Sequence, residues 1–390
     1  MIIQNETQHY TGQISIILLS LFGFWQPVNL NTKWTICLYQ IYSNFMVFFY
    51  TTFTFTLFMY FKNVWENIDS FMLNLYYFFA IFSILIKQIT IIIKRNVIID
   101  LQDKLLYKLC QPRDSYEMEI LQKQSQICKL NGIIFLILLN VTAIVAVVSP
   151  IIKGMNMTLP IAAWCPYQLE SKTLFSLTYA FQSMALLMTA CTSASVEGLV
   201  LTFVLQICAQ LDLLFHRLHL LPYLLKNYRS YSEFSIEETR LIADSTKHHI
   251  HIYLLGQQLN NIFGFVIFTQ FFSSMISLCA VVYELTNLSL SNSTYWLMLS
   301  CMGSVITQTF LYCFYGQKIM EKSTEVTYAI QQMHWTVLTN RGKKALLIMM
   351  TRAARPIELN GSSVITMSFK TFVKIAKSAY SAYNLLNSAF

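Results

Sequence analysis

The sequence has unusually little charge. Of its 390 residues, 12% are Asp, Glu, Lys or Arg, whereas 55% are hydrophobic. A soluble domain carries about 25% charged residues, so a soluble chain of this composition could not cover its apolar surface. The shortage of charge is explained if lipid surrounds much of the chain. The composition therefore predicts an all-α integral membrane protein. Its net charge of +8 indicates basic cytoplasmic loops rather than a nucleic-acid-binding surface.

Motifs that carry enzyme or metal chemistry are also scarce. No pair among the nine cysteines has zinc-ligand spacing, and glycine-rich phosphate loops, nucleophile elbows and paired carboxylates facing a pocket are missing. Five histidines lie close together in the sequence but lack the Cys or carboxylate partners of a metal site, so we expect them to be solvated or packed. They are His216, His219, His248, His249 and His251. The sequence predicts no enzyme activity, no metal and no cofactor.

Long runs without charge are what the sequence has instead. Seven runs are each long enough for a spanning helix of about 20 residues. They are 36–60, 71–93, 131–152, 173–204, 262–283, 295–316 and 364–386. Lys87, inside the second run, is expected to extend toward the nearer membrane face. The seventh run is the weakest because it contains three lysines. The run 14–25 is too short to span and should lie along the cytoplasmic face. Residues 1–390 are thus predicted to form one seven-span domain.

The distribution of basic residues predicts the orientation. If the amino terminus is cytoplasmic, the inside segments hold 20 Lys and Arg residues and the outside segments hold three. Such an imbalance sets membrane topology. The glycosylation sequons at Asn156, Asn287 and Asn292 then fall outside, where glycosylation occurs. A G-protein-coupled receptor has the opposite orientation, and its Asp-Arg-Tyr and Asn-Pro-x-x-Tyr motifs are missing from the corresponding spans.

The segment between the fourth and fifth predicted spans is expected to be partly helical. Residues 211–225 are amphipathic, and Ser235 precedes an acidic first turn, which is typical of a helix start. Helical extensions below the membrane would form a cytoplasmic anchor through which subunits pack, so the sequence indicates an oligomer.

The seventh predicted span carries a polar stripe. Its members recur at steps of three or four residues, so they share one helix face, and such a face should meet protein or water rather than lipid. They are Lys370, Lys374, Lys377, Ser381, Asn384 and Ser388. Extension of Lys370 and Lys374 toward the cytoplasm is an alternative for the inner half, but it does not account for the outer three. Leu385, at the edge of the stripe, is the predicted gate, because an apolar ring can close a polar pore by dewetting.

Large apolar side chains in the outer halves of the spans predict a ligand pocket. Aromatic and methionine walls suit an adaptable apolar site, although helix packing is the alternative for any one of these residues. They are Tyr76, Phe79, Ile144, Val148, Phe181, Met184, Met188 and Met298. No acidic residue lies at this depth to meet an amine, so the predicted ligand is small, neutral and hydrophobic.

The carboxyl-terminal third resembles the insect odorant receptor family in the order and spacing of its motifs over about 80 residues. The motifs are Tyr312-Cys-Phe-Tyr-Gly316, Ser323, Ala329-Ile330, His334-Trp335, Met350-x-Arg352-Ala353-x-Arg355-Pro356, Phe369, Phe372 and Ser378 to Leu386. Trp164-Cys165-Pro166 is similar to the family's second outside loop, although the family usually has Tyr where Cys165 stands.

The resemblance implies an odorant-binding subunit of a ligand-gated, nonselective cation channel that detects a volatile molecule. It also implies a hetero-tetramer with a shared co-receptor subunit in the plasma membrane of olfactory sensory neurons, with Leu385 at the family's gate position. The chain is shorter than the co-receptor and lacks its long insertion between spans four and five, so it resembles a tuning subunit. A gustatory-type receptor of the same architecture is the first alternative, and a G-protein-coupled receptor is the second.

Overall fold

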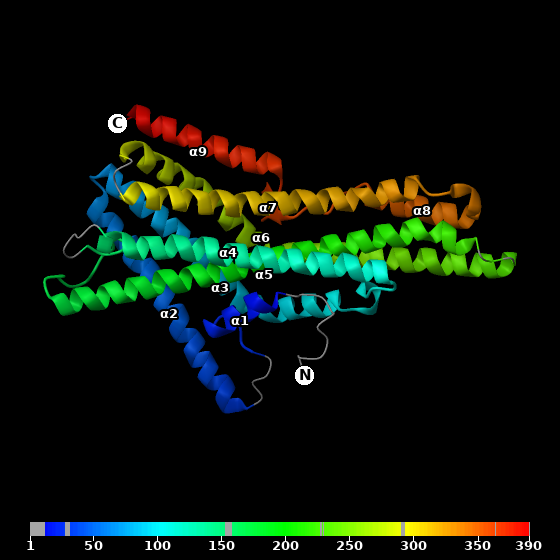
Figure 1. Ribbon diagram of the computed structural model, residues 1–390, viewed down its shortest axis with the longest axis horizontal. Helices are drawn as coiled ribbons and strands as arrows, with labels where there is room; N and C mark the ends of the chain where they lie inside the picture. The colour runs from blue at the N-terminus through cyan, green and yellow to red at the C-terminus, as the bar shows by residue number, and fades with distance from the viewer. Residues whose placement is uncertain are drawn as a thin grey trace.

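The computed structural model describes residues 12–27, 32–152, 158–226, 228, 230–289, 293–362 and 364–389, except for the side chains of residue 293 and residues 386–389. The described chain is an elongated bundle in which most of the long helices run along one axis and the helix of residues 33–64 crosses them obliquely (Figure 1). The α-helices are α1 (Gln13–Leu21), α2 (Lys33–Val64), α3 (Ile68–Leu105), α4 (Ser115–Ile152), α5 (Lys172–Leu225), α6 (Tyr231–Asn287), α7 (Ser293–Gln331), α8 (Asn340–Ala353) and α9 (Phe369–Ala389). Two 3₁₀ turns, η1 (Lys108–Cys110) and η2 (Trp335–Val337), and two strands, β1 (Asn360–Gly361) and β2 (Ile365–Thr366), complete the order.

Six helices within the described residues, α2 to α7, are long and apolar enough to cross a membrane. Each contains one of the first six predicted spans entirely. The helices differ in how many residues of their apolar stretch are buried in the bundle: 89% of those residues are buried in α5, against 28% in α2 and in α4. α5 is therefore the central helix of the bundle. α2 and α4 present apolar side chains outward, which suits a helix that faces lipid.

The seventh predicted span begins later than the sequence suggested. α9 begins at Phe369, whereas the predicted span began at residue 364. The intervening residues pair with β1 instead, as Thr366 lies opposite Asn360 and Ile365 opposite Gly361. Ser368 then starts the helix, because its Oγ accepts a hydrogen bond from the backbone N–H of Thr371 at 3.4 Å. A local hairpin thus supplies the hydrogen bonds that the predicted helix would have supplied.

α5 and α6 are longer than a membrane requires. They have 54 and 57 residues, which is roughly 80 Å each at 1.5 Å per residue, whereas the hydrocarbon core is about 30 Å thick. The remainder forms the predicted helical extension, where α8 packs against α6 and α7 at the end of the bundle opposite α9 (Figure 1). The short α1 packs against α5, with Ser15 and Leu19 buried.

A buried ion pair joins the helices of this extension. Arg217 of α5 donates to both carboxylate oxygens of Glu117, at 2.7 and 2.8 Å. His248 of α6 lies beside them, with Nε2 3.0 Å from Oε1 of Gln210. Burial and the neighbouring charge of Arg217 lower the pKa of His248 well below its usual range, so its imidazole is neutral at pH 7. This histidine is packed within a hydrogen-bond network.

Candidate functional site

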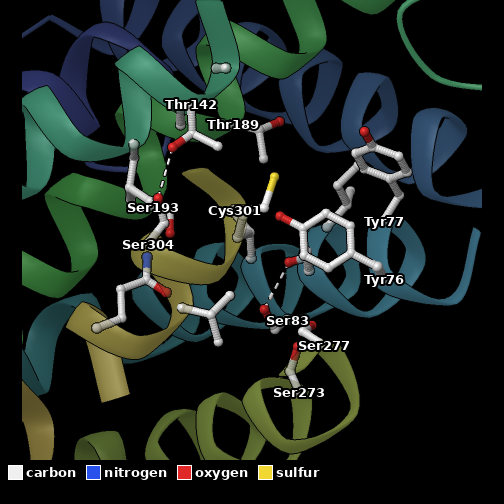
Figure 2. Close-up of a pocket in the computed structure, with 18 of the residues that line it drawn as sticks. Tyr76, Tyr77, Ser83, Thr142, Thr189, Ser193, Ser273, Ser277, Cys301 and Ser304 are labelled. Atoms are coloured by element: carbon white, nitrogen blue, oxygen red, sulfur yellow. Dashed lines mark hydrogen bonds between the residues drawn. The ribbon is translucent and has the colours of Figure 1, made fainter. Parts of the chain in front are cut away.

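A cavity of about 130 Å³ lies among α3, α4, α5, α6 and α7, within the segments predicted to span the membrane (Figure 2). Each of the five helices contributes one stripe of side chains, for example Tyr76, Ala80, Ser83 and Lys87 at steps of four, three and four along α3. The other residues that line it are Tyr77, Ile81, Ile84, Leu139, Thr142, Ala143, Ala146, Leu186, Thr189, Ala190, Ser193, Gln270, Ser273, Ser274, Ser277, Cys301, Ser304, Val305 and Gln308. The volume is close to that of a buried cavity that holds benzene, about 150 Å³.

An aromatic pair forms one wall of the cavity. The rings of Tyr76 and Tyr77 lie 5.0 Å apart at 63°, an edge-to-face arrangement that aromatic pairs favour. In Figure 2 the sulfur of Cys301 lies near the phenol of Tyr76. A tyrosine hydroxyl can donate and accept hydrogen bonds, so this wall combines apolar surface with a polar group.

Serine and threonine hydroxyls face the cavity from several helices. Most donate their only proton to a backbone carbonyl: Ser83 to Ala80 at 2.8 Å, and Ser273 to Phe79 at 2.8 Å. Thr142 and Ser304 lie 2.7 Å apart and join α4 to α7, as the dashed line in Figure 2 shows. Hydroxyls that have donated their proton keep only lone pairs. They therefore present hydrogen-bond acceptors to the cavity.

Lys87 lines the cavity and is buried, so the prediction that it extends to the membrane face was wrong. Its side chain is 1% exposed, and Nζ lies 2.5 Å from Oε1 of Glu197, which is 0% exposed. Nζ also donates to Oε1 of Gln270 at 2.5 Å. The amide of Gln270 then donates to Gln308 at 3.1 Å and to Ser274 at 3.2 Å. Pairing replaces snorkelling because a carboxylate and an amide in neighbouring helices supply the contacts that water would otherwise make.

The sequence contained a signal for this pair. Lys87 and Glu197 are opposite charges inside two different predicted spans, and ionisable residues within a membrane usually face each other or a cavity. Taken separately, each charge suggested only the end of a span. Taken together, they indicated that α3 and α5 are neighbours.

The structure places the eight predicted pocket residues in different surroundings. Tyr76 lines the cavity, and Met298 is fully buried in the same hydrophobic cluster. Neither Met298 nor the remaining six residues line the cavity. Phe181 packs on the rings of Phe49 and Phe53, Phe79 on that of Phe272, and Met188 against the main core. Ile144, Val148 and Met184 are 50%, 37% and 52% exposed.

Helix faces explain these positions. On α4, Leu139, Thr142, Ala143 and Ala146 share the face that borders the cavity. Ile144 lies one residue after Ala143 and therefore about 100° around the helix, on the outward side. Both faces of α4 are apolar, so hydropathy could not distinguish them.

The polar stripe of α9 faces away from its own bundle. Its described members, Lys370, Lys374, Lys377, Ser381 and Asn384, are all exposed. The opposite face, which includes Thr371, Ile375 and Ala379, is buried where α9 packs against α6 and α7 at the edge of the bundle (Figure 1). Leu385 is 71% exposed, and the side chain of Ser388 lies outside the described part of the chain.

One predicted glycosylation site is described. Asn287 is exposed at the end of α6, and its Nδ2 lies 3.5 Å from Oδ1 of Asp69. Asn156 and Asn292 lie outside the described residues.

Several residues of the carboxyl-terminal motifs meet at the junction of α6, α7 and α8 with the chain that leads to α9. The guanidinium of Arg352 lies 3.2 Å from the ring centre of Tyr253, whose hydroxyl donates to the carbonyl of Pro356 at 3.2 Å. Ser323 Oγ accepts from the backbone N–H of Ile357 at 2.9 Å. A Cβ added at Gly316 would overlap Met367. These contacts fix the path of the chain before α9.

Comparisons with known proteins agree with this architecture. The family model described as 7tm Odorant receptor matches residues 67–380, from just before α3 to within α9. Odorant receptor 85f of Drosophila melanogaster is 29% identical over 152 residues, which are 38% of each chain. Odorant receptor 67a of the same species is 25% identical over 206 residues, 53% of this chain and 50% of that protein. These alignments thus span half or less of the length of either relative.

Solved structures match over almost the whole chain. The insect olfactory receptor OR5 from Machilis hrabei, in complex with eugenol, superposes with a TM-score of 0.84 at 15% identity and covers 97% of this chain and 98% of that one. A second structure of the same receptor gives a TM-score of 0.83, with 96% of each chain covered. The chain therefore has the all-α membrane fold of these structures.

Proposed function

Because the chain belongs to the 7tm odorant receptor family, we propose that it is the odorant-binding subunit of a ligand-gated, nonselective cation channel. Family membership sets aside the gustatory-type and G-protein-coupled alternatives, and it makes the chain a receptor rather than an enzyme. The observation that carries the proposal is the cavity, because five helices line it and it has the volume of a small volatile molecule. A receptor of the same fold is known in complex with eugenol, a small aromatic compound.

The proposed pore is lined by α9. In this arrangement the exposed polar stripe lines a water-filled path shared with neighbouring subunits, and Leu385 closes it as an apolar ring. The contact of α9 with α6 and α7 supports this assignment, because both of those helices also line the cavity. Ligand binding can then bias the position of α9 through two packed helices. Positive charge disfavours cations, so the lysines of α9 belong in the wide cytoplasmic end of the path.

The proposed partner is a shared odorant co-receptor, with which the chain forms a hetero-tetramer in the plasma membrane of olfactory sensory neurons. The long extensions of α5 and α6, with α8, offer the surface on which subunits would pack. In the proposed orientation the amino terminus is cytoplasmic and Asn287 lies outside, where its exposed side chain can be glycosylated. The proposed ligand is small and volatile.

Recording odour-evoked current tests the proposal. The chain is expressed in oocytes with the co-receptor, and the co-receptor alone is the control. We expect inward currents for some members of a volatile panel only when both subunits are present, with a reversal potential near zero, as a nonselective cation pore gives. A surface-expressed chain that adds no response to any panel member would overturn the proposal.

A further inference from the structure

We propose that the cavity selects neutral molecules that carry a hydrogen-bond-accepting oxygen, such as an aldehyde or ketone, and that Lys87 donates the hydrogen bond that recognises this oxygen. The inference rests on the proposed function, since it names the class of ligand for the same cavity. It adds a polar contact to the expectation from the sequence, which was a small, neutral and hydrophobic ligand.

The ammonium of Lys87 has more N–H donors than the protein supplies acceptors in the contacts described. An ammonium has three N–H donors. Among the described residues, Glu197 accepts one at 2.5 Å and Gln270 accepts a second at 2.5 Å. The third N–H has no acceptor among these contacts, although the side chain is only 1% exposed and lines the cavity. A buried donor without a partner is unfavourable, so a ligand oxygen at this position gains a charge-assisted hydrogen bond.

Several hydroxyl groups around the cavity use their proton within the protein. Ser83, Ser273 and Thr189 each donate their proton to a backbone carbonyl. Thr142 can donate to Leu138 or Ser304, and either choice uses its proton within the protein. These hydroxyls therefore offer acceptors to a ligand, whereas Lys87 offers a charged donor. The remaining lining residues include Ala80, Ile84 and Leu139, which suit a hydrocarbon body.

The charge of the site favours a neutral ligand. The Lys87–Glu197 pair has no net charge, and both side chains are buried. A carboxylate ligand would add a second negative charge beside Glu197 without a further cation. An amine would meet the ammonium of Lys87, because Glu197 does not line the cavity. Isolated buried charges are strongly disfavoured, so a carbonyl compound fits better than either ion.

Matched pairs of probes separate recognition of oxygen from recognition of shape. Benzaldehyde and styrene differ only in that oxygen replaces a CH₂ group, as do cyclohexanone and methylenecyclohexane. For the chain co-expressed with the co-receptor, we expect half-maximal concentrations about tenfold or more lower for the carbonyl member of at least one pair. Benzoate should be inactive. Thermal shift of the purified protein in detergent, with the same probes, measures binding without channel opening.

Variants of the ion pair assign the effect to Lys87. Lys87→Met alone leaves Glu197 unpaired and can fail to fold, so the test uses Lys87→Met together with Glu197→Gln, which keeps the site neutral. This double variant should lose the preference for carbonyl over alkene, while Lys87→Arg should retain part of it. Gln88→Met is the matched control. Gln88 is equally buried on α3 but donates to Thr192 and does not line the cavity, so the preference should be unchanged.

The outcomes distinguish the two proposals. Equal responses to carbonyl and alkene, or a preference that survives in the double variant, would overturn the role of Lys87 and leave the odorant-gated channel intact. A carbonyl-selective thermal shift without any current would support the role of Lys87 and count against the channel. If no probe evokes a current or shifts the melting temperature of a well-folded protein, the role of Lys87 is overturned, and the response to the wider volatile panel decides the channel proposal.

Discussion

At the scale of single residues, the buried pair of Lys87 and Glu197 is the most consequential feature. It joins α3 to α5 beside the cavity, and Gln270 and Gln308 continue the network to α6 and α7. A buried ion pair adds little stability compared with apolar packing, but breaking it leaves an uncompensated charge. The pair and the two glutamines therefore join four of the helices that line the cavity.

The small gain from forming a buried ion pair and the large cost of breaking it predict how variants of the pair behave. Glu197→Gln alone should destabilise the protein by about 3–5 kcal/mol, because the ammonium of Lys87 remains buried without a counter-charge. Combining it with Lys87→Met should restore most of that loss. Thermal unfolding in detergent, together with surface abundance, measures the effect. Equal losses for the single and double variants would show that the charges are not coupled.

At the scale of elements, α7 comes very close to the chain before α9 at Gly316. A Cβ on Gly316 would overlap both the backbone and the side chain of Met367, immediately before Ser368 starts α9. No other residue type fits at this position without moving the hairpin. The position of α9 is thus set by α7 as well as by α6.

Gly316→Ala should therefore displace the start of α9 and reduce odour-evoked current, even though alanine favours helix by about 0.5–1 kcal/mol over glycine. Gly303→Ala is the matched control on the same helix, since a Cβ there meets nothing within 4 Å. Current amplitude at equal surface abundance checks the effect. Similar currents for both variants would mean that the contact does not position α9.

The gate prediction also belongs to α9. Leu385→Ser, co-expressed with the co-receptor, should raise the current without odorant or alter ion selectivity, because a polar side chain wets an apolar constriction. Val373→Ser, an exposed position on the same helix three turns earlier, should have a smaller effect. If basal current and permeability respond to position 373 and not to position 385, Leu385 is not at the constriction.

Some structural features depend on one segment of the sequence alone and can be predicted from it, whereas others depend on contacts between distant segments. The first six spans could be located because a spanning helix needs about 20 apolar residues in a row, a property of one segment alone. The start of α9 could not be located in this way, because residues 365 and 366 pair with β1 instead of joining the helix. The cavity-lining face of α4 was also hidden, since Ala143 and Ile144 are both apolar and only packing distinguishes them. The burial of Lys87 could not be predicted from its own segment either, because its partner Glu197 lies 110 positions away in the sequence.

At the scale of the whole molecule, the bundle divides along its length into a part that fits the membrane and an extension beyond it. The 20-to-three distribution of basic residues predicts that the extension is cytoplasmic. A tag placed before residue 1 should therefore be inaccessible to antibody on intact cells, whereas a tag after residue 390 should be labelled. Permeabilised cells provide the control. Labelling of the amino-terminal tag alone would reverse the orientation.

The central claim is that the cavity binds the odorant and α9 opens the pore. One pair of recordings tests it: odour-evoked current from Ala143→Phe and from Ile144→Phe, each with the co-receptor. Ala143 lines the cavity, whereas Ile144 is half exposed on the outward side of α4. Phenylalanine at position 143 should fill much of the roughly 130 Å³ and abolish the response, yet the basal current of Leu385→Ser should persist in that background. At position 144 the response should remain. A normal response from Ala143→Phe, or a loss confined to Ile144→Phe, would contradict the account.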